Sequence, residues 1–139
     1  MKVVGFNYTK VSAERVINWE PLKKINTDIQ FTEVSNEKIE VMKEGDIVRI
    51  GFKFGVEYEP KNATIILEGF VTLAMNSDES NELIKSWTKK KELNKDLVNT
   101  LVKLLWKKCN LKAFQLEEEL NIPTHLQLPQ ISIRPQKSA

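Results

Sequence analysis

The sequence has few of the side chains on which enzymes and metal proteins depend. Among its 139 residues there is one cysteine, Cys109, and one histidine, His125. A single cysteine excludes an internal disulfide and a cysteine-based metal cluster, and a single histidine excludes multi-histidine metal sites. We therefore predict no catalytic residue, no metal and no cofactor, so that the protein is not an enzyme.

Glycine-rich loops and long apolar runs are missing as well. Gly51, Gly55 and Gly69 fall within strand-like segments, where glycine marks close approach of a backbone or an aromatic ring and not a phosphate loop. No stretch approaches the roughly 18 apolar residues of a membrane-spanning helix. The opening MKVVGFNYTK lacks the apolar core of a signal peptide. We expect one cytoplasmic domain over residues 1–139, with no membrane partner.

The first half of the chain has the period of β-strands. The clearest strand is DIVRIGFKFGVEYEP, where every second residue is apolar: Val48, Ile50, Phe52, Phe54, Val56 and Tyr58. A turn at residues 59–62 leads to ATIILEGFVTLAMN, which predicts an antiparallel hairpin. Ile66 and Phe70 face away from the other apolar residues of this second strand, so we expect it to be covered on both faces.

Two earlier segments also alternate. VVGFNYTKVSAERV aligns Val4, Phe6 and Tyr8, and KINTDIQFTEV places Ile29 and Phe31 on one face. Together these segments predict four strands, mostly antiparallel, between about residue 3 and residue 76.

The second half has the period of helices, between residues 78 and 120. Ser77 or Asp78 can cap the first helix and Asn94 the second, which either breaks at Asn110 or continues to Leu120. Apolar residues of the second helix sweep an arc of roughly 200°. That arc either sits deep in the domain or packs against a second subunit. The candidate oligomer interface is Leu97, Leu101, Val102, Leu105 and Cys109.

The tail, residues 121–139, contains the stretch NIPTHLQLPQISI. Pro123 and Pro129 forbid a helix there, so we expect an extended strap over apolar surface or, alternatively, a mobile arm. As a strap it forms one wall of a groove, opposite Phe6, Tyr8, Ile29 and Phe31. We expect His125 to be an ordinary surface or packing histidine and the acids at 117–119 to form a solvated face.

One charged region stands out in a chain of net charge +2. Residues 85–112 hold nine lysines against only Glu92 and Asp96. Such a surface can bind nucleic acid or can be a solvated face with packed lysine stems. Arginine is the side chain that most often recognises bases, and the region has none. Its absence favours the solvated face.

With these residues in order, the chain resembles the family of the bacterial protein-export chaperone SecB. The shared order is an opening strand, a Trp-x-Pro crossover, three antiparallel strands, a long helix and an apolar extended segment with two prolines. Here the crossover is NWEP, with Trp19 and Pro21, and the extended segment is IPTHLQLPQISI. The resemblance implies the family's fold, a holdase-like role and a homo-oligomer, a dimer or a tetramer.

There are departures from the family pattern. The family has a glycine shortly before the first proline, where this chain has EELNIP, and about residues 111–120 add a helical stretch. The family's last helix has no counterpart in residues 134–139. Its acidic surface, which helps it to dock its motor partner, is replaced by a net positive charge. These departures do not support delivery of clients to an export motor.

We therefore predict an α+β fold, with a four-stranded antiparallel sheet, helices packed on one face and an extended apolar tail. The predicted function is ATP-independent binding of unfolded or partly folded polypeptides through exposed apolar surface, because such contact is non-directional and promiscuous. The alternatives are a nucleic-acid-binding module and a dedicated partner protein of antitoxin type. The candidate client-binding residues are Phe6, Tyr8, Trp19, Ile29, Phe31, Leu126, Leu128 and Ile131.

Overall fold

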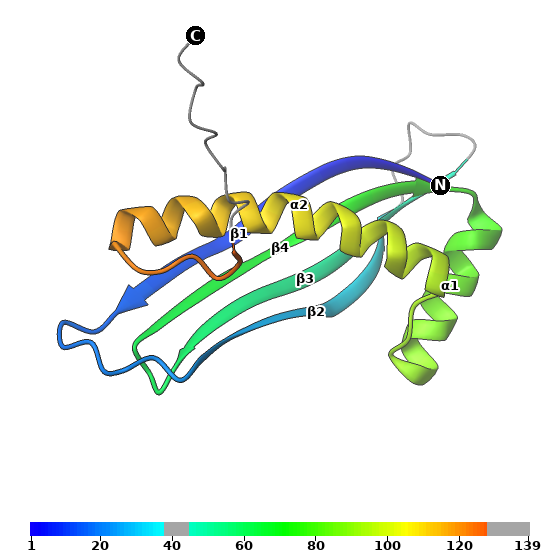
Figure 1. The fold of residues 1–139 in the computed structure, drawn as a ribbon. Helices are drawn as coiled ribbons and strands as arrows, with labels where there is room; N and C mark the ends of the chain where they lie inside the picture. The colour runs from blue at the N-terminus through cyan, green and yellow to red at the C-terminus, as the bar shows by residue number, and fades with distance from the viewer. Residues whose placement is uncertain (38–44, 128–139) are drawn as a thin grey trace, which may run out of the picture.

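A computed structural model describes residues 1–37 and 45–127. Four long strands come first: β1 (Lys2–Arg15), β2 (Lys24–Glu37), β3 (Asp46–Glu59) and β4 (Ala63–Met75). Two helices follow, α1 (Ser77–Lys90) and α2 (Lys95–Leu120). The strands form one antiparallel sheet in the order β1-β4-β3-β2, with both helices on the same face (Figure 1). The predicted α+β architecture is confirmed.

The core lies between the sheet and the helices, on what we call the inner face. The alternating residues of β3 are all fully buried there, and those of β4 join them, because the two strands occupy the centre of the sheet. On the outer face Ile66 and Phe70 are only half-buried, with the Arg49 guanidinium 4.5 Å from the Phe70 ring. The expectation that β4 is covered on both faces is wrong within this chain, since both helices lie on the inner side.

Side-chain caps set the ends of the helices. Asn76 caps α1, one residue earlier than predicted, by accepting a hydrogen bond from the Glu79 backbone N–H at 2.8 Å. Asn94 caps α2 as predicted, accepting from the Asp96 N–H at 2.8 Å. The helix continues through Asn110 to Leu120, and the left-handed φ of 55° at Asn121 makes that residue the predicted C-cap.

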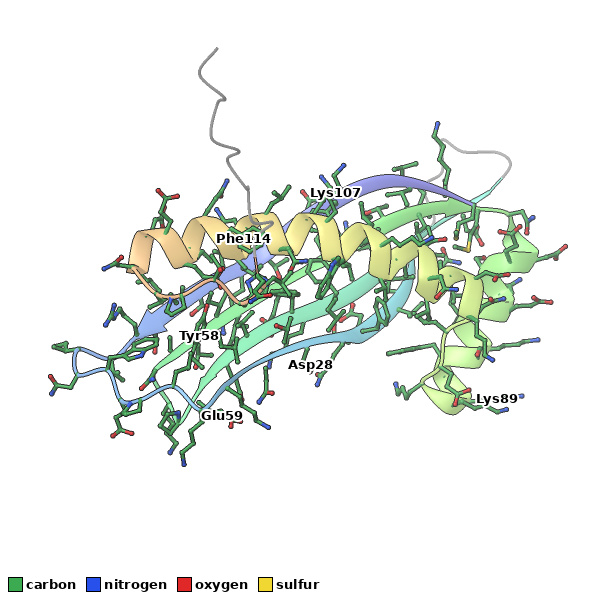
Figure 2. The ribbon with its side chains drawn as sticks, viewed as in Figure 1. Asp28, Tyr58, Glu59, Lys89, Lys107 and Phe114 are labelled. Atoms are coloured by element: carbon green, nitrogen blue, oxygen red, sulfur yellow. The ribbon has the colours of Figure 1, made fainter. Side chains whose placement is uncertain are left out.

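The long helix α2 buries every fourth residue along its length. This buried stripe consists of Leu97, Leu101, Leu105, Cys109, Ala113 and Glu117. The helix packs on β1 and β4, whereas α1 packs on β2 and β3. Side chains of the sheet fill the space beneath α2 (Figure 2). Within residues 1–37 and 45–127, no helix combines the length and apolar composition needed to cross a membrane.

Candidate binding surface on the inner face of the sheet

An aromatic row crosses the inner face from one sheet edge to the other. Phe31 pairs with Phe52, Phe52 with Gly69, and Gly69 with Tyr8, so the four residues share one rung of the sheet. A Cβ on Gly69 would lie 2.1 Å from the Asn7 carbonyl oxygen and 3.0 Å from the Phe52 ring. Glycine therefore leaves room for the Phe52 ring over β4, as expected from its position in a strand.

The Phe52 ring contacts the two aromatic side chains predicted on β1. Its centroid lies 5.3 Å from that of Phe6 and 6.3 Å from that of Tyr8. At the other end of the row, Phe31 is only partly buried against the core. Thus Phe6 and Tyr8, predicted as client-binding residues, form an aromatic cluster with the buried Phe52, and Phe31, predicted from a separate segment, is the strand partner of Phe52 at the other end of the row.

Helix α2 contacts the β1 end of this cluster. The Tyr8 hydroxyl donates a hydrogen bond to the Lys108 carbonyl oxygen at 3.2 Å, and the Lys108 ammonium lies 5.3 Å from the Phe6 ring. Burial, and then the neighbouring Cys109 thiol, raise the pKa of Tyr8 far above its usual range. Burial also raises the pKa of the Cys109 thiol to about 11, so this thiol is uncharged at neutral pH.

The β2 end is more open, and we call it the β2 apolar edge. Its members are hydrophobic, point to the inner face and are only partly buried against the core: Ile25, Ile29, Phe31 and Val34. Ile29 lies beside the buried Phe54 in the next rung along the sheet. The β2 apolar edge is therefore an apolar strip, interrupted on the same face by Thr27, with one side on the core and the other accessible.

Trp19 lies away from the aromatic row. Its ring contacts Tyr58, at a centroid distance of 6.1 Å, and the Arg15 guanidinium at 5.1 Å. Arg15 in turn donates hydrogen bonds to the carbonyl oxygens of Leu120 and Asn121 at the end of α2, both at 3.1 Å. Tyr58 lies six positions along β3 from Phe52, which corresponds to roughly 20 Å. Trp19 therefore packs at the far end of the sheet, with the groups that hold the end of α2.

The predicted oligomer-interface residues lie largely in the core of the single chain. Leu101, Leu105 and Cys109 are completely inaccessible there, and Leu97 is 6% exposed; Val102 is half-buried. The wide apolar arc was expected either to lie deep in the domain or to pack against a second subunit. Burial within the domain accounts for these four side chains, because the chain's own sheet covers them. Association of copies through α2 stays a prediction, and it needs other residues of the helix.

A buried polar cluster ties α2 to the segment that follows it. Glu117 is fully buried, and its Oε2 accepts hydrogen bonds from the Tyr58 hydroxyl at 2.5 Å and from the His125 backbone N–H at 2.9 Å. The His125 Nδ1 lies 2.9 Å from the same oxygen, and its Nε2 lies 2.7 Å from the Asn110 Oδ1. Burial, then the hydrogen bond and charge of Glu117, raise the pKa of Tyr58 far above its usual range.

This cluster corrects the sequence prediction for residue 117. We expected the acids at 117–119 to be solvated, and this holds only for Glu118 and Glu119. Glu117 is buried because it continues the every-fourth-residue stripe of α2 toward the end of β3. The available signals were that spacing, together with Tyr58 closing the alternating pattern of β3. His125 is the packing histidine that was expected, and its ring lies 5.1 Å from that of Phe114.

The start of the tail lies against the core. Ile122 and His125 are each 8% exposed, Leu126 is half-buried, and the Pro123 carbonyl oxygen lies 2.5 Å from the Tyr58 hydroxyl. Residues 122–126 therefore take the position of a strap. Leu128 and Ile131, the other predicted client-binding residues of the tail, lie outside the described residues, and their role stays a prediction.

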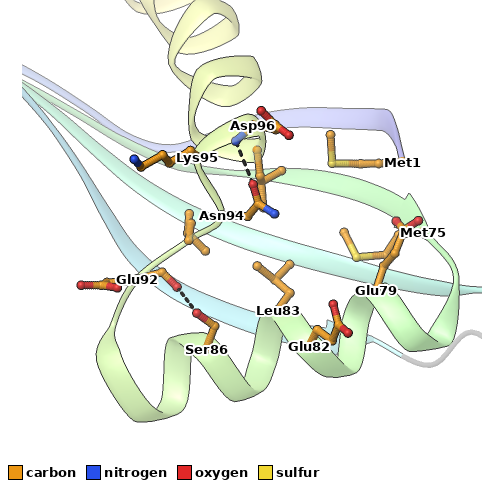
Figure 3. A pocket seen from close by; sticks show the side chains of 12 residues that line it. Met1, Met75, Glu79, Glu82, Leu83, Ser86, Glu92, Asn94, Lys95 and Asp96 are labelled. Atoms are coloured by element: carbon orange, nitrogen blue, oxygen red, sulfur yellow. Dashed lines mark hydrogen bonds between the residues drawn. The ribbon is translucent and has the colours of Figure 1, made fainter.

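A cavity of about 720 Å³ lies at the opposite end of α2, between that helix and α1 (Figure 3). Its apolar lining consists of Met1, Met75, Leu83, Leu93 and Leu97, and its charged lining residues are Glu79, Glu82, Glu92, Asp96 and Lys95. None of the predicted client-binding residues lines it. In the described ranges, no group of three or more histidine, cysteine or acidic side chains is arranged to hold a metal ion.

Comparison with known proteins supports the resemblance at the level of the fold. The chain is similar to a SecB-like chaperone of Mycobacterium tuberculosis, solved in complex with a ChAD peptide from the HigA1 antitoxin. The TM-score is 0.52 and the identity 14%, over 94% of this chain and 90% of that one. No protein-family model and no curated protein sequence matches the chain. The chain therefore has a SecB-like fold, a four-stranded antiparallel sheet followed by two helices.

Proposed function

We propose that this protein binds unfolded or partly folded polypeptides without ATP, as a holdase-type chaperone does. The observation that carries the proposal is the β2 apolar edge. These four hydrophobic side chains line the inner face beside the aromatic row and remain partly accessible. Helix α2 packs over β1 and β4, and α1 contacts β2 at one end of the sheet (Figure 1). The SecB-like fold supports the same role, since a protein of this fold has been solved with a bound peptide.

The proposed contact is apolar and extended. An unfolded segment lying along the β2 apolar edge would cover Ile29 and Phe31, and Leu126 of the tail would extend the apolar surface. Full burial of one large apolar side chain is worth roughly 1.5–3 kcal/mol, so two half-buried anchors would supply about 2 kcal/mol between them. A contact of this kind selects clients by exposed apolar surface and not by sequence.

The test is suppression of aggregation of a denatured protein, measured by light scattering without nucleotide. We expect wild type to suppress aggregation at moderate salt, and Phe31→Ser to weaken client binding by about three- to tenfold, because it removes one anchor. The matched control is Phe70→Ser, which removes the same side chain from the outer face. Thermal melting of both variants establishes that they fold. Equal activity of the two variants, or no suppression by wild type, would contradict the proposal.

The distribution of charge favours this function over nucleic-acid binding. Exposed lysines lie on both helices, but the acidic cavity between the helices interrupts them. A polyanion bound across both helices would pass four carboxylates, which repel it. Titration with an oligonucleotide at increasing salt is the second arm of the experiment. Tight, steeply salt-dependent binding in the absence of aggregation suppression would favour the alternative.

A further inference from the structure

We propose that the cavity between α1 and α2 binds an amphipathic organic amine, a small molecule that carries a protonated nitrogen on an apolar body. This site is separate from the proposed function, because the cavity shares no residue with the β2 apolar edge. Its volume of about 720 Å³ lies within the range of roughly 300–1,000 Å³ that is usual for small-molecule sites. Its lining is partly apolar and partly acidic, and such an amine can contact both parts.

The apolar part of the lining consists of side chains that the fold holds in place. Met75, Leu83 and Leu97 are buried in the core, so each presents only a small part of its surface to the cavity. Leu93, from the linker between the helices, and Met1 complete this part. Methionine side chains adapt to bodies of different shape. The cavity therefore accepts an aliphatic or aromatic body without specifying one skeleton.

Hydrogen bonds fix the linker between the two helices, so the cavity is formed before a ligand binds. Lys91 ends α1 in the left-handed region, with a φ of 53°, and donates its N–H to the Trp87 carbonyl oxygen at 2.9 Å. The Ser86 hydroxyl donates to the Glu92 carbonyl oxygen at 3.0 Å, and Asn94 caps α2 (Figure 3). Little ordering of the chain is then needed on binding, which favours affinity.

The charge of the lining selects a cation. Four carboxylates line the cavity: Glu79, Glu82, Glu92 and Asp96. They outnumber the cations of the lining by two, even when the amino group of Met1 is counted with Lys95. The Asn76 amide donates to Glu79 at 3.1 Å, and the other three carboxylates have no side-chain partner among the described residues. A cleft lined by one sign of charge concentrates ligands of the opposite sign.

The same residues disfavour two other kinds of ligand. The N-terminus of a helix attracts anions, but the first turn of α2 carries Asp96, whose N–H already donates to the Asn94 side chain. A metal ion needs acids that converge on one point, and no three acidic, histidine or cysteine side chains do so in residues 1–37 and 45–127. Separated acids beside an apolar surface fit a protonated amine on an apolar body.

The test is a titration of the full chain with octylammonium, followed by heteronuclear NMR. We expect a dissociation constant of about 0.1–1 mM, because the ligand is small and the carboxylates are exposed. The amide signals of Leu83, Leu93 and Leu97 should shift most. Octanol and octanoate have the same apolar chain without the positive charge, and they should bind about threefold and tenfold more weakly. Added salt should weaken the binding of octylammonium, since exposed charges are screened.

A double variant tests the carboxylates. Glu82→Gln combined with Glu92→Gln removes two charges and keeps the side-chain size, and it should weaken octylammonium binding about three- to tenfold. The matched control combines Glu118→Gln with Glu119→Gln, two exposed acids at the other end of α2, and should bind like wild type. All four side chains are exposed, and melting curves establish that both variants fold.

Phe31→Ser separates this site from the proposed function. That variant should lose client binding but keep the dissociation constant of wild type for octylammonium, because Phe31 does not line the cavity. The proposal is overturned if octanol or octanoate binds as tightly as octylammonium. It is also overturned if the shifted amides lie along β2 instead of the cavity, or if the variant without Glu82 and Glu92 binds like wild type.

Discussion

Replacement of Glu117 by Gln tests whether the buried polar cluster holds the start of the tail. Three donors converge on this carboxylate: the Tyr58 hydroxyl, the His125 backbone N–H and the His125 Nδ1. The glutamine amide keeps the size of the side chain, but it retains a single acceptor oxygen and places an NH2 group, itself a donor, where the second carboxylate oxygen was. The variant loses the charge that strengthens each of these hydrogen bonds.

The expected cost follows from these contacts. A hydrogen bond to a charged group contributes about 1.5–3 kcal/mol, and this substitution weakens three of them at once. We therefore expect Glu117→Gln to lower the free energy of unfolding by about 3 kcal/mol. For a chain of this length that corresponds to a fall in Tm of about 10–15 °C.

Urea unfolding followed by circular dichroism measures the loss, and hydrogen exchange locates it. The amide of His125 donates directly to Glu117, so its exchange should accelerate most. The matched control is Glu118→Gln, the same change at the exposed neighbour, which should stay within about 0.5 kcal/mol of wild type. If Glu117→Gln is as stable as Glu118→Gln, the cluster does not anchor the tail and the reasoning is refuted.

Two further predictions concern the sheet and the thiol. Gly69→Ala should destabilise the pairing of β1 with β4 by more than about 2 kcal/mol, because the new Cβ would collide with the Asn7 carbonyl 2.1 Å away. Gly55→Ala, whose nearest atom would be 3.9 Å away, is the control, and equal melting temperatures would contradict the close approach. Native Cys109 should resist a thiol reagent at pH 8 and react in urea. Because its folded pKa of about 11 exceeds the ordinary 9.0, its contribution to stability should persist below pH 9 and disappear between pH 9 and 11. Cys109→Ala should lose less stability than wild type between pH 9 and 11. Rapid labelling of the thiol in the folded protein would contradict its burial.

Local patterns in the sequence were sufficient for most of the fold. The alternation from Val48 to Tyr58 predicted β3, and Asn94 and Asn121 were identified as caps of α2, because strand period and caps depend on neighbouring residues. The burial of Glu117 was missed, because it depends on Tyr58, which is 59 positions away in the chain. No local pattern distinguishes an acid with such a partner from an acid in water.

The aromatic row illustrates the same limit at the candidate binding surface. Phe6, Tyr8 and Phe31 were each identified by strand alternation, but only the strand order places them on one inner face. Their connection runs through Phe52 over Gly69, and it depends on the register of three strand pairs. A shift of one residue in any pair would turn that strand's side chains to the outer face. The residues were therefore predictable, whereas the cluster they form was not.

The wide apolar arc of α2 follows from the geometry of the helix. Residues four apart advance 40° around the axis, since each residue turns 100°. A buried stripe that takes every fourth residue from Leu97 to Glu117 therefore winds around the helix and spreads apolar residues over far more than one face. The core contact follows this winding, from the apolar lining of the cavity beside α1 at Leu97 to Tyr58 and the tail at Glu117. Burial within the chain thus explains most of the arc, and the large apolar residues of α2 that it leaves exposed are Trp106 and Leu111.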